Sequence, residues 1–212
     1  MTSRRPSIVV LDYGSGNLRS AQRALQRVGG DVEVTADHAA CLRADGLVVP
    51  GVGAFAACMA GLRAVGGDQL IAKRIASGLP VLGICVGMQV LFEAGDEHGD
   101  RTTGLGCWPG VVQKLIAPVL PHMGWNVVAP PAASRLLAGL DPSAMFYFVH
   151  SYAATKAPIR PGEPRQPFTG WSTHGQDFVA LVEDGPLMAT QFHPEKSADA
   201  GAVLLANWLK TL

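Results

Sequence analysis

The sequence has no excess of charge of either sign, because its 17 lysines and arginines equal its 17 aspartates and glutamates. A zero net charge gives no support to binding of nucleic acid or anionic membranes, which needs a basic surface. Long hydrophobic runs are also lacking. The apolar run Ser7–Leu11 is too short for the core of a signal peptide, and no later run approaches the length of a membrane span. We therefore expect neither a nucleic-acid nor a membrane partner.

Cysteine is scarce and scattered. The four cysteines stand at positions 41, 58, 85 and 107, and no two of them form a Cys-x-x-Cys pair. This spacing indicates neither a zinc site nor a disulfide framework. The sequence therefore predicts a cytoplasmic protein with reduced thiols and no metal ion.

The order of apolar runs predicts one α/β domain over residues 1–212, with residues 1–6 flexible. Buried strands are expected at 7–11, 32–35, 46–49 and 81–85, and helices at 18–28, 54–64 and 67–77 between them. Such alternation is typical of a three-layer αβα fold with a mostly parallel central sheet. Beyond residue 104, short strands indicate antiparallel extensions of that sheet, at 111–116, 125–129, 145–152, 168–173, 177–183 and 187–192. A last helix is expected at 199–209, and the proline-rich segment 157–167 is expected to be an exposed loop.

The chain is organised around Gly83-Ile84-Cys85-Val86-Gly87, which follows a buried strand and precedes a helix predicted over Met88–Ala94. This spacing is that of a nucleophile elbow, in which the nucleophile stands on a sharp strand-to-helix turn. Glycine is needed on both sides, because a Cβ there would collide with the neighbouring strand and helix. The alternative is a buried structural cysteine, since free cysteines are often buried.

A base for this cysteine is available in Gln191-Phe192-His193-Pro194-Glu195-Lys196. Residues i and i+2 of an extended segment point to the same side, so His193 and Glu195 are expected to face one direction. Pro194 favours an extended conformation of His193. The alternative is a strand-end histidine paired with its neighbour. The remaining histidines, at 38, 98, 122, 150 and 174, are interpreted as structural or exposed, with only His150 near the site.

The loop Pro50-Gly51-Val52-Gly53-Ala54-Phe55 follows the third strand, at the edge where open α/β sheets bind ligands. It lacks the lysine and the serine or threonine of a phosphate-binding loop. It could instead present backbone N–H groups to a developing oxyanion, because its glycines let the peptide planes rotate. An ordinary tight turn is the alternative.

The elbow and Phe192-His193-Pro194-Glu195 resemble the class I glutamine amidotransferases and, more narrowly, the glutaminase subunits of imidazole glycerol phosphate synthases. Further matching stretches are spread over nearly the whole chain, at 11–18, 50–55, 121–126, 150–152 and 194–197. The match is weakest in the loop 157–167. The resemblance implies glutamine hydrolysis by a Cys85, His193 and Glu195 triad without a cofactor. It also implies oxyanion donors at Val52, Gly53 and Val86, and a glutamine site at Gly51, Gln89, Glu93, His150, Ser151 and Tyr152.

The resemblance further implies a heterodimer with a (β/α)8-barrel cyclase, which uses the ammonia to convert PRFAR to imidazole glycerol phosphate and AICAR. Asn17, Met123, Trp125 and Lys196 match positions near that interface, although core packing is an alternative role for Trp125. Two other functions stay open: a glutaminase subunit for another synthase, and a non-enzymatic elbow-cysteine protein of the DJ-1-like kind. The His193 and Glu195 pair disfavours the second of these.

Overall fold

The computed structural model describes residues 4–131 and 133–212. Of the segment 1–6, expected to be flexible, residues 1–3 lie outside the described residues. Arg4 pairs with Asp45 at 2.8 Å between Nη2 and Oδ1, and Pro6 accepts a hydrogen bond from the N–H of Asp31. Arg4 and Pro6 are therefore tied to the domain.

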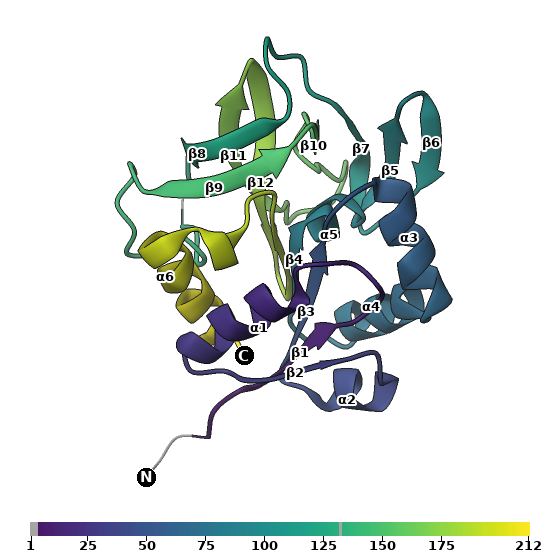
Figure 1. The fold of residues 1–212 in the computed structure, drawn as a ribbon, viewed down its shortest axis with the longest axis vertical. Helices are drawn as coiled ribbons and strands as arrows, with labels where there is room; N and C mark the ends of the chain where they lie inside the picture. The colour runs from purple at the N-terminus through teal and green to yellow at the C-terminus, as the bar shows by residue number, and fades with distance from the viewer. Residues whose placement is uncertain (1–3, 132) are drawn as a thin grey trace.

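A seven-stranded sheet forms the centre of the molecule, in the order β11-β12-β13-β4-β3-β1-β2 (Figure 1). Its parallel part consists of β1 (Ser7–Leu11), β2 (Asp31–Thr35), β3 (Gly46–Gly51), β4 (Val81–Cys85) and β13 (Leu187–Thr190). The strands β11 (Phe168–His174) and β12 (Gln176–Asp184) extend it in antiparallel fashion. The prediction of a mostly parallel sheet with antiparallel extensions is confirmed for these strands.

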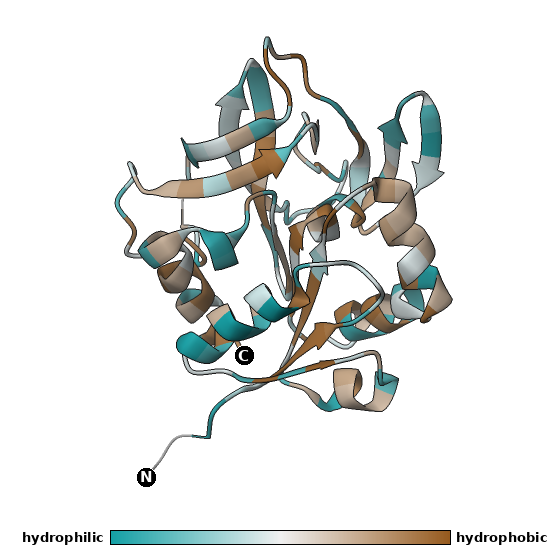
Figure 2. Cartoon of the chain, viewed as in Figure 1, coloured by the Kyte–Doolittle hydropathy of each residue, from teal (hydrophilic) through white to brown (hydrophobic). Residues whose placement is uncertain are grey.

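Helices cover both faces of this sheet, as a three-layer fold requires (Figure 1). One face carries α1 (Leu18–Arg27) and α6 (Ala198–Leu209), which contact each other, and the other carries α2 (His38–Arg43), α3 (Phe55–Ala64) and α4 (Gly67–Ala76). Strands covered on both faces read as continuous apolar runs, and β3 and β4 are buried along their whole length. Figure 2 shows these central strands as the hydrophobic interior of the molecule, with α1 as a largely hydrophilic helix beside them.

Two smaller sheets stand beside the carboxyl edge of the parallel strands. One has the order β10-β7-β5-β6, formed by β5 (Phe92–Glu97), β6 (Asp100–Thr103), β7 (Trp108–Lys114) and β10 (Tyr152–Ala154). The other is a two-stranded ribbon of β8 (His122–Val127) and β9 (Met145–His150). The short strands expected at these places exist, but they form separate sheets and do not extend the central one.

The prediction of a helix over Met88–Ala94 is wrong. The helix α5 (Val86–Gln89) is only one turn long, and β5 begins at Phe92. Phe92 pairs with Trp108 of β7, and Ala94 pairs with Thr103 of β6. Pairing with segments later in the chain therefore overrides the helical pattern. Helix α2, which was not predicted, begins after Asp37, whose carboxylate accepts the N–H of Ala39 at 2.9 Å.

The loop 157–167 contains no helix or strand, as predicted. Arg160 fastens it to the domain through a 2.6 Å contact between Nη2 and the Asp184 carboxylate. None of the helices in the described part of the chain combines the length and the apolar character that crossing a bilayer requires.

Candidate active site

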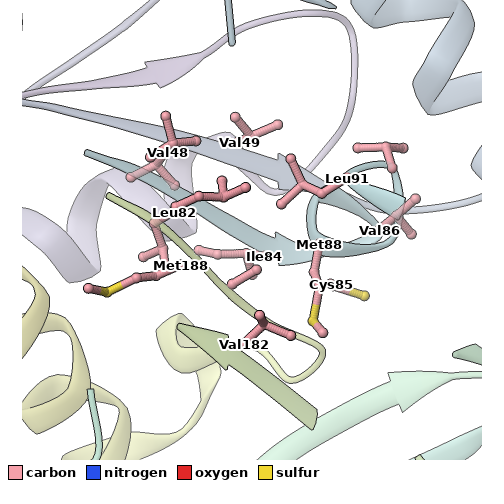
Figure 3. Packing of buried hydrophobic residues seen from close by; sticks show 14 of the residues in the cluster. Val48, Val49, Leu82, Ile84, Cys85, Val86, Met88, Leu91, Val182 and Met188 are labelled. Atoms are coloured by element: carbon pink, nitrogen blue, oxygen red, sulfur yellow. The ribbon is translucent and has the colours of Figure 1, made fainter. Parts of the chain in front are cut away.

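Cys85 stands at the end of β4 in a strained backbone conformation, with φ 56° and ψ −114°. Positive φ is costly for a residue with a side chain and marks positions that the surrounding structure holds in place. A Cβ on Gly87 would lie 1.8 Å from the carbonyl oxygen of Val49, and one on Gly83 would lie 2.7 Å from that of Gly87. The requirement for glycine on both sides of Cys85 is thus confirmed. Figure 3 shows Cys85 at the end of the buried packing around Leu82 and Ile84.

His193 and Glu195 form a buried pair just beyond β13. The Nδ1 of His193 donates to Oε1 of Glu195 at 2.7 Å, and both side chains are almost completely buried. His193 is extended, as expected, with φ −100° and ψ 95°. Residues Pro194–Lys196, however, form the 3₁₀ turn η1, so Glu195 reaches the imidazole by a turn of the chain rather than by the alternation of a strand.

The surroundings of His193 favour its protonated form. Burial acts to lower the pKa of His193, but the adjacent Cys85 sulfur and the Glu195 carboxylate outweigh burial and raise that pKa to about 9. The Nε2 atom is buried and makes no hydrogen bond to any described residue. The imidazole therefore has one nitrogen fixed by a carboxylate and the other available for proton transfer.

Asn17 adds a second donor to this carboxylate. Its Nδ2 donates to the same Oε1 of Glu195, while its backbone has φ 71° in the left-handed region. Asn17 stands directly before the first residue of α1 but makes no capping hydrogen bond with its side chain. The side chain is thus committed to Glu195, a contact that the sequence did not suggest.

A cavity of about 190 Å³ opens beside Cys85 and His193. Most residues expected to bind glutamine or the oxyanion border it, together with three that were not expected here. The lining consists of Val52, Gly53, Cys85, Val86, Gln89, Glu97, Val149, His150, Ser151, Tyr152, His193 and Lys196. Lys196 was predicted at a partner interface, and Glu97 and Val149 were not singled out at all.

Two residues predicted for the glutamine site do not line this cavity. Glu93 is exposed on β5, where its carboxylate accepts the N–H of Gly110 at 3.0 Å. The position that the resemblance implied for Glu93 at the glutamine site therefore differs from its place in the fold, where β5 turns its side chain to the surface. Gly51 instead serves packing, since a Cβ there would lie 2.4 Å from the nitrogen of Gly87.

The loop after β3 is held by one side chain from the β1–α1 loop and one from α3. Ser15 Oγ accepts the N–H of Val52 at 3.0 Å, and the Cys58 thiol donates to the Val52 carbonyl at 3.4 Å. Gly53 has φ 87° and open space around its Cα. Because the C=O and N–H of a trans peptide point in opposite directions, the N–H of Gly53 points away from Cys58.

Two glutamine side chains form a relay on another side of the cavity. Gln89 Nε2 donates to the carbonyl of Tyr152 at 2.8 Å and to Oε1 of Gln191 at 3.0 Å. Gln191 Nε2 in turn lies 3.8 Å from the Cys85 sulfur as a weak donor. Gln191 was not assigned a role from the sequence, although it stands only two residues before His193.

Met123 and Trp125 are exposed on β8, at 64 % and 49 % of their surface. Trp125 contacts Tyr147 edge to face, with ring centroids 5.9 Å apart. Core packing, the alternative role for Trp125, is therefore wrong. Among the residues that the structure describes, no cluster of three or more histidine, cysteine or carboxylate side chains is arranged to hold a metal ion.

Residues 9–212 match the model of the family described as glutamine amidotransferase class-I. Three similar proteins are named imidazole glycerol phosphate synthase subunit HisH. The protein from Nocardia farcinica is 64 % identical and covers 98 % of this chain and 99 % of its own. Those from Mycobacterium bovis and Thermobifida fusca are 65 % and 61 % identical, over 97 % and 98 % of this chain and 98 % and 100 % of theirs.

Two solved structures share the fold. A protein from Thermoplasma acidophilum, described as part of a putative GMP synthase, superimposes with a TM-score of 0.69 at 22 % identity, over 98 % of this chain and 94 % of its own. A structure described as a glutamine amidotransferase also has a TM-score of 0.69, at 20 % identity over 93 % and 98 % of the two chains. The chain belongs to the class I glutamine amidotransferase family and, within it, to the HisH subunits of imidazole glycerol phosphate synthase.

Proposed function

We propose that this protein hydrolyses glutamine to glutamate and ammonia, with Cys85 as nucleophile, His193 as general acid and base, and Glu195 as the group that orients the imidazole. The observation that carries the proposal is the meeting of a strained cysteine and a buried histidine–carboxylate pair at one cavity. A nucleophile, a base and an orienting group are the parts that covalent acyl transfer needs.

The reaction proceeds in two halves. The Cys85 sulfur attacks the side-chain amide carbon of glutamine, and the C–N bond breaks as His193 gives its Nε2 proton to the departing nitrogen, which leaves as ammonia. The resulting thioester is attacked by water, whose proton returns to His193, and glutamate departs as the sulfur is released. Glu195 holds the imidazole orientation and balances its positive charge in both halves.

The oxyanion of each tetrahedral intermediate is stabilised by backbone N–H groups of Val86 and of Gly53. One such donor contributes about a hundredfold to a thousandfold in rate. Cavity residues of opposite charge, Glu97 and Lys196, suit the ammonium and carboxylate groups of an amino acid. One oxygen of Glu97 accepts the N–H of Phe55 at 2.9 Å, which fixes the position of the other.

The ammonia passes to a (β/α)8-barrel cyclase that forms a heterodimer with this chain in the cytoplasm and converts PRFAR to imidazole glycerol phosphate and AICAR in histidine biosynthesis. Relatives named as synthase subunits support a partner, as do the exposed Met123 and Trp125, because aromatic residues and methionine are enriched at interfaces. The resemblance also implies interface positions for Asn17 and Lys196, but Asn17 contacts Glu195 and Lys196 lines the cavity, so the interface proposal rests on Met123 and Trp125.

Replacing Cys85 by serine tests the assignment. Cys85→Ser should lower glutamine hydrolysis by about a thousandfold or more, while the complex still makes product from ammonium salts, because only the ammonia source is lost. Cys107→Ser is the matched control, since Cys107 is half-buried and outside the cavity. Substantial hydrolysis by the Cys85 variant, or equal loss in both variants, would contradict the role of Cys85.

A further inference from the structure

His122 lies on the inner face of the β8–β9 ribbon and is joined to the cavity by hydrogen bonds. Its Nδ1 is 3.1 Å from Nε2 of His150, and its Nε2 is 3.3 Å from Nδ2 of Asn126. The other nitrogen of His150, Nδ1, is 3.0 Å from the carbonyl oxygen of Tyr152. His150 and Tyr152 both line the cavity, so His122 stands directly behind its wall.

The groups at the two ends of this hydrogen-bond network fix the direction of every hydrogen bond in it. A carbonyl oxygen only accepts, so His150 must carry its proton on Nδ1 and leave Nε2 as an acceptor. His122 must then donate from Nδ1 and accept at Nε2. Asn126 is oriented to supply that last proton, because its Oδ1 accepts the N–H of Val127 at 2.8 Å while its Nδ2 also donates to the Thr173 carbonyl at 2.9 Å.

Both imidazoles are kept neutral, as the hydrogen-bond directions given above require. Burial lowers the pKa of His122 to about 4 and that of His150 to about 3. The titratable groups that face the pair are His174 and His193, and neither supplies a negative charge. His122 is also stacked between Phe148 and His174, with ring centroids 4.8 and 4.3 Å from its own.

The chain of bonds ends at groups that shape the glutamine cavity. The Tyr152 carbonyl accepts from His150 Nδ1 and also from Gln89 Nε2. Gln89 is joined through Gln191 to the Cys85 sulfur. A change in the tautomer or rotation of His150 would therefore move a donor away from Tyr152, on the wall that faces the nucleophile.

We propose that His122 is a positioning residue, which holds His150 in the Nδ1–H tautomer and thereby fixes the Tyr152 side of the cavity for glutamine binding. This inference rests on the proposed glutaminase function for its effect on substrate, but not for the tautomer it assigns. His122 touches no reacting atom. Its loss should therefore raise the KM for glutamine more than it lowers kcat.

The tautomers are tested first in the unmodified protein, by two-dimensional NMR that correlates the imidazole nitrogens with their ring protons. Both His122 and His150 should show protonated Nδ1 and unprotonated Nε2 at neutral pH. An Nε2–H tautomer for either ring would overturn the inference, whatever the protein's activity.

Substitutions then separate the hydrogen bond from the ring. His122→Phe keeps the stacking between Phe148 and His174 but removes the donor to His150, whereas His122→Asn keeps an N–H donor near the Nδ1 position. His174→Phe is the matched control. His174 stacks on His122 but donates to the Val119 carbonyl, which is not part of the hydrogen-bond network of His122 and His150.

Glutamine hydrolysis is measured for the full chain with its cyclase partner, and binding of L-glutamine is measured in a Cys85→Ala background. His122→Phe should raise KM and Kd by about tenfold, the effect of leaving one buried acceptor unpaired, and should let His150 populate both tautomers. His122→Asn should recover most of the loss, and His174→Phe should match the unmodified protein.

Unchanged glutamine binding in a folded His122→Phe variant would overturn the inference, as would equal losses in the phenylalanine and asparagine variants. An unmodified complex that fails to hydrolyse glutamine would instead contradict the proposed function, while the tautomer assignment would still be decided by NMR.

Discussion

Two histidines border the same cavity, and their surroundings favour the protonated form of one and the neutral form of the other. His193 and His150 are both buried, at 1 % and 7 % of their surface. The pKa of His193 is raised to about 9, whereas that of His150 is lowered to about 3. His193 donates to a carboxylate, and His150 donates to a neutral carbonyl beside another histidine. Burial alone therefore does not decide the charge of an imidazole; the charge of its hydrogen-bond partner does.

The largest expected effect distinguishes His193, which acts in the chemical step, from His150, which acts in glutamine binding. His193→Ala should lower kcat by about a hundredfold to ten-thousandfold, because general acid and base catalysis is lost. His150→Asn should chiefly raise KM, since His150 shapes the cavity wall and transfers no proton. Steady-state glutamate production measures both. A loss of kcat in His150→Asn as severe as that in His193→Ala would erase the distinction.

A milder effect is expected when only the charge beside His193 is removed. Glu195→Gln keeps a side chain of the same shape but not the carboxylate that raises the pKa of His193. We expect Glu195→Gln to lower kcat less than His193→Ala does, by a factor of about ten or more, because the orienting acid contributes less than the base. The same glutaminase assay measures it. If Glu195→Gln were the more damaging change, the two roles would be reversed.

The smallest effect concerns stability in acid. The pKa values of His150 and His122 in the fold, about 3 and about 4, lie below the ordinary value of 6.5. Between these values the unfolded chain binds protons that the folded chain does not, so the free energy of unfolding falls as the pH falls below 6.5. His193 has the opposite sign: its stabilising contribution is complete below pH 6.5 and is lost as the pH rises through about 9.

Urea denaturation between about pH 6.5 and pH 5 measures this acid limb, before most carboxylates titrate. The unmodified protein should lose stability over that interval, and His150→Asn should lose less, because it has one fewer histidine to protonate on unfolding. His38→Asn is the control, since His38 is exposed. Equal slopes in all three proteins would mean that His150 is not held neutral by the fold.

The sequence allowed accurate prediction where the signals are local. The run before Cys85 and its flanking glycines predicted β4 and the elbow, because close packing leaves no room for a Cβ at Gly87. The helix predicted over Met88–Ala94 was wrong, by contrast, because that prediction depended on which way the chain turns after Gln89. That turn is decided by pairing with β6 and β7, which lie later in the chain, and a short apolar run is compatible with either a helix or a strand.

Pairs that meet only in the fold were also missed. Asn17 was expected near a partner interface, yet its amide reaches Glu195 across 178 positions. His122 reads as a structural histidine because nothing beside it in the sequence is charged, and its partner His150 faces it only through the register of β8 on β9. No local pattern reports such contacts, because they depend on how separate segments pack.

Strand β8 has two faces with separate tasks. His122 and Asn126 point inward to the hydrogen-bonded chain, while Met123, Trp125 and Val127 are exposed on the other side. Because successive side chains of a strand alternate between faces, insertion or deletion of a single residue in β8 would exchange the two sets. Apolar side chains would then meet His150, and polar ones the solvent-facing surface. Redesign of the outer surface must therefore proceed by substitution at alternate positions and never by a change in strand length.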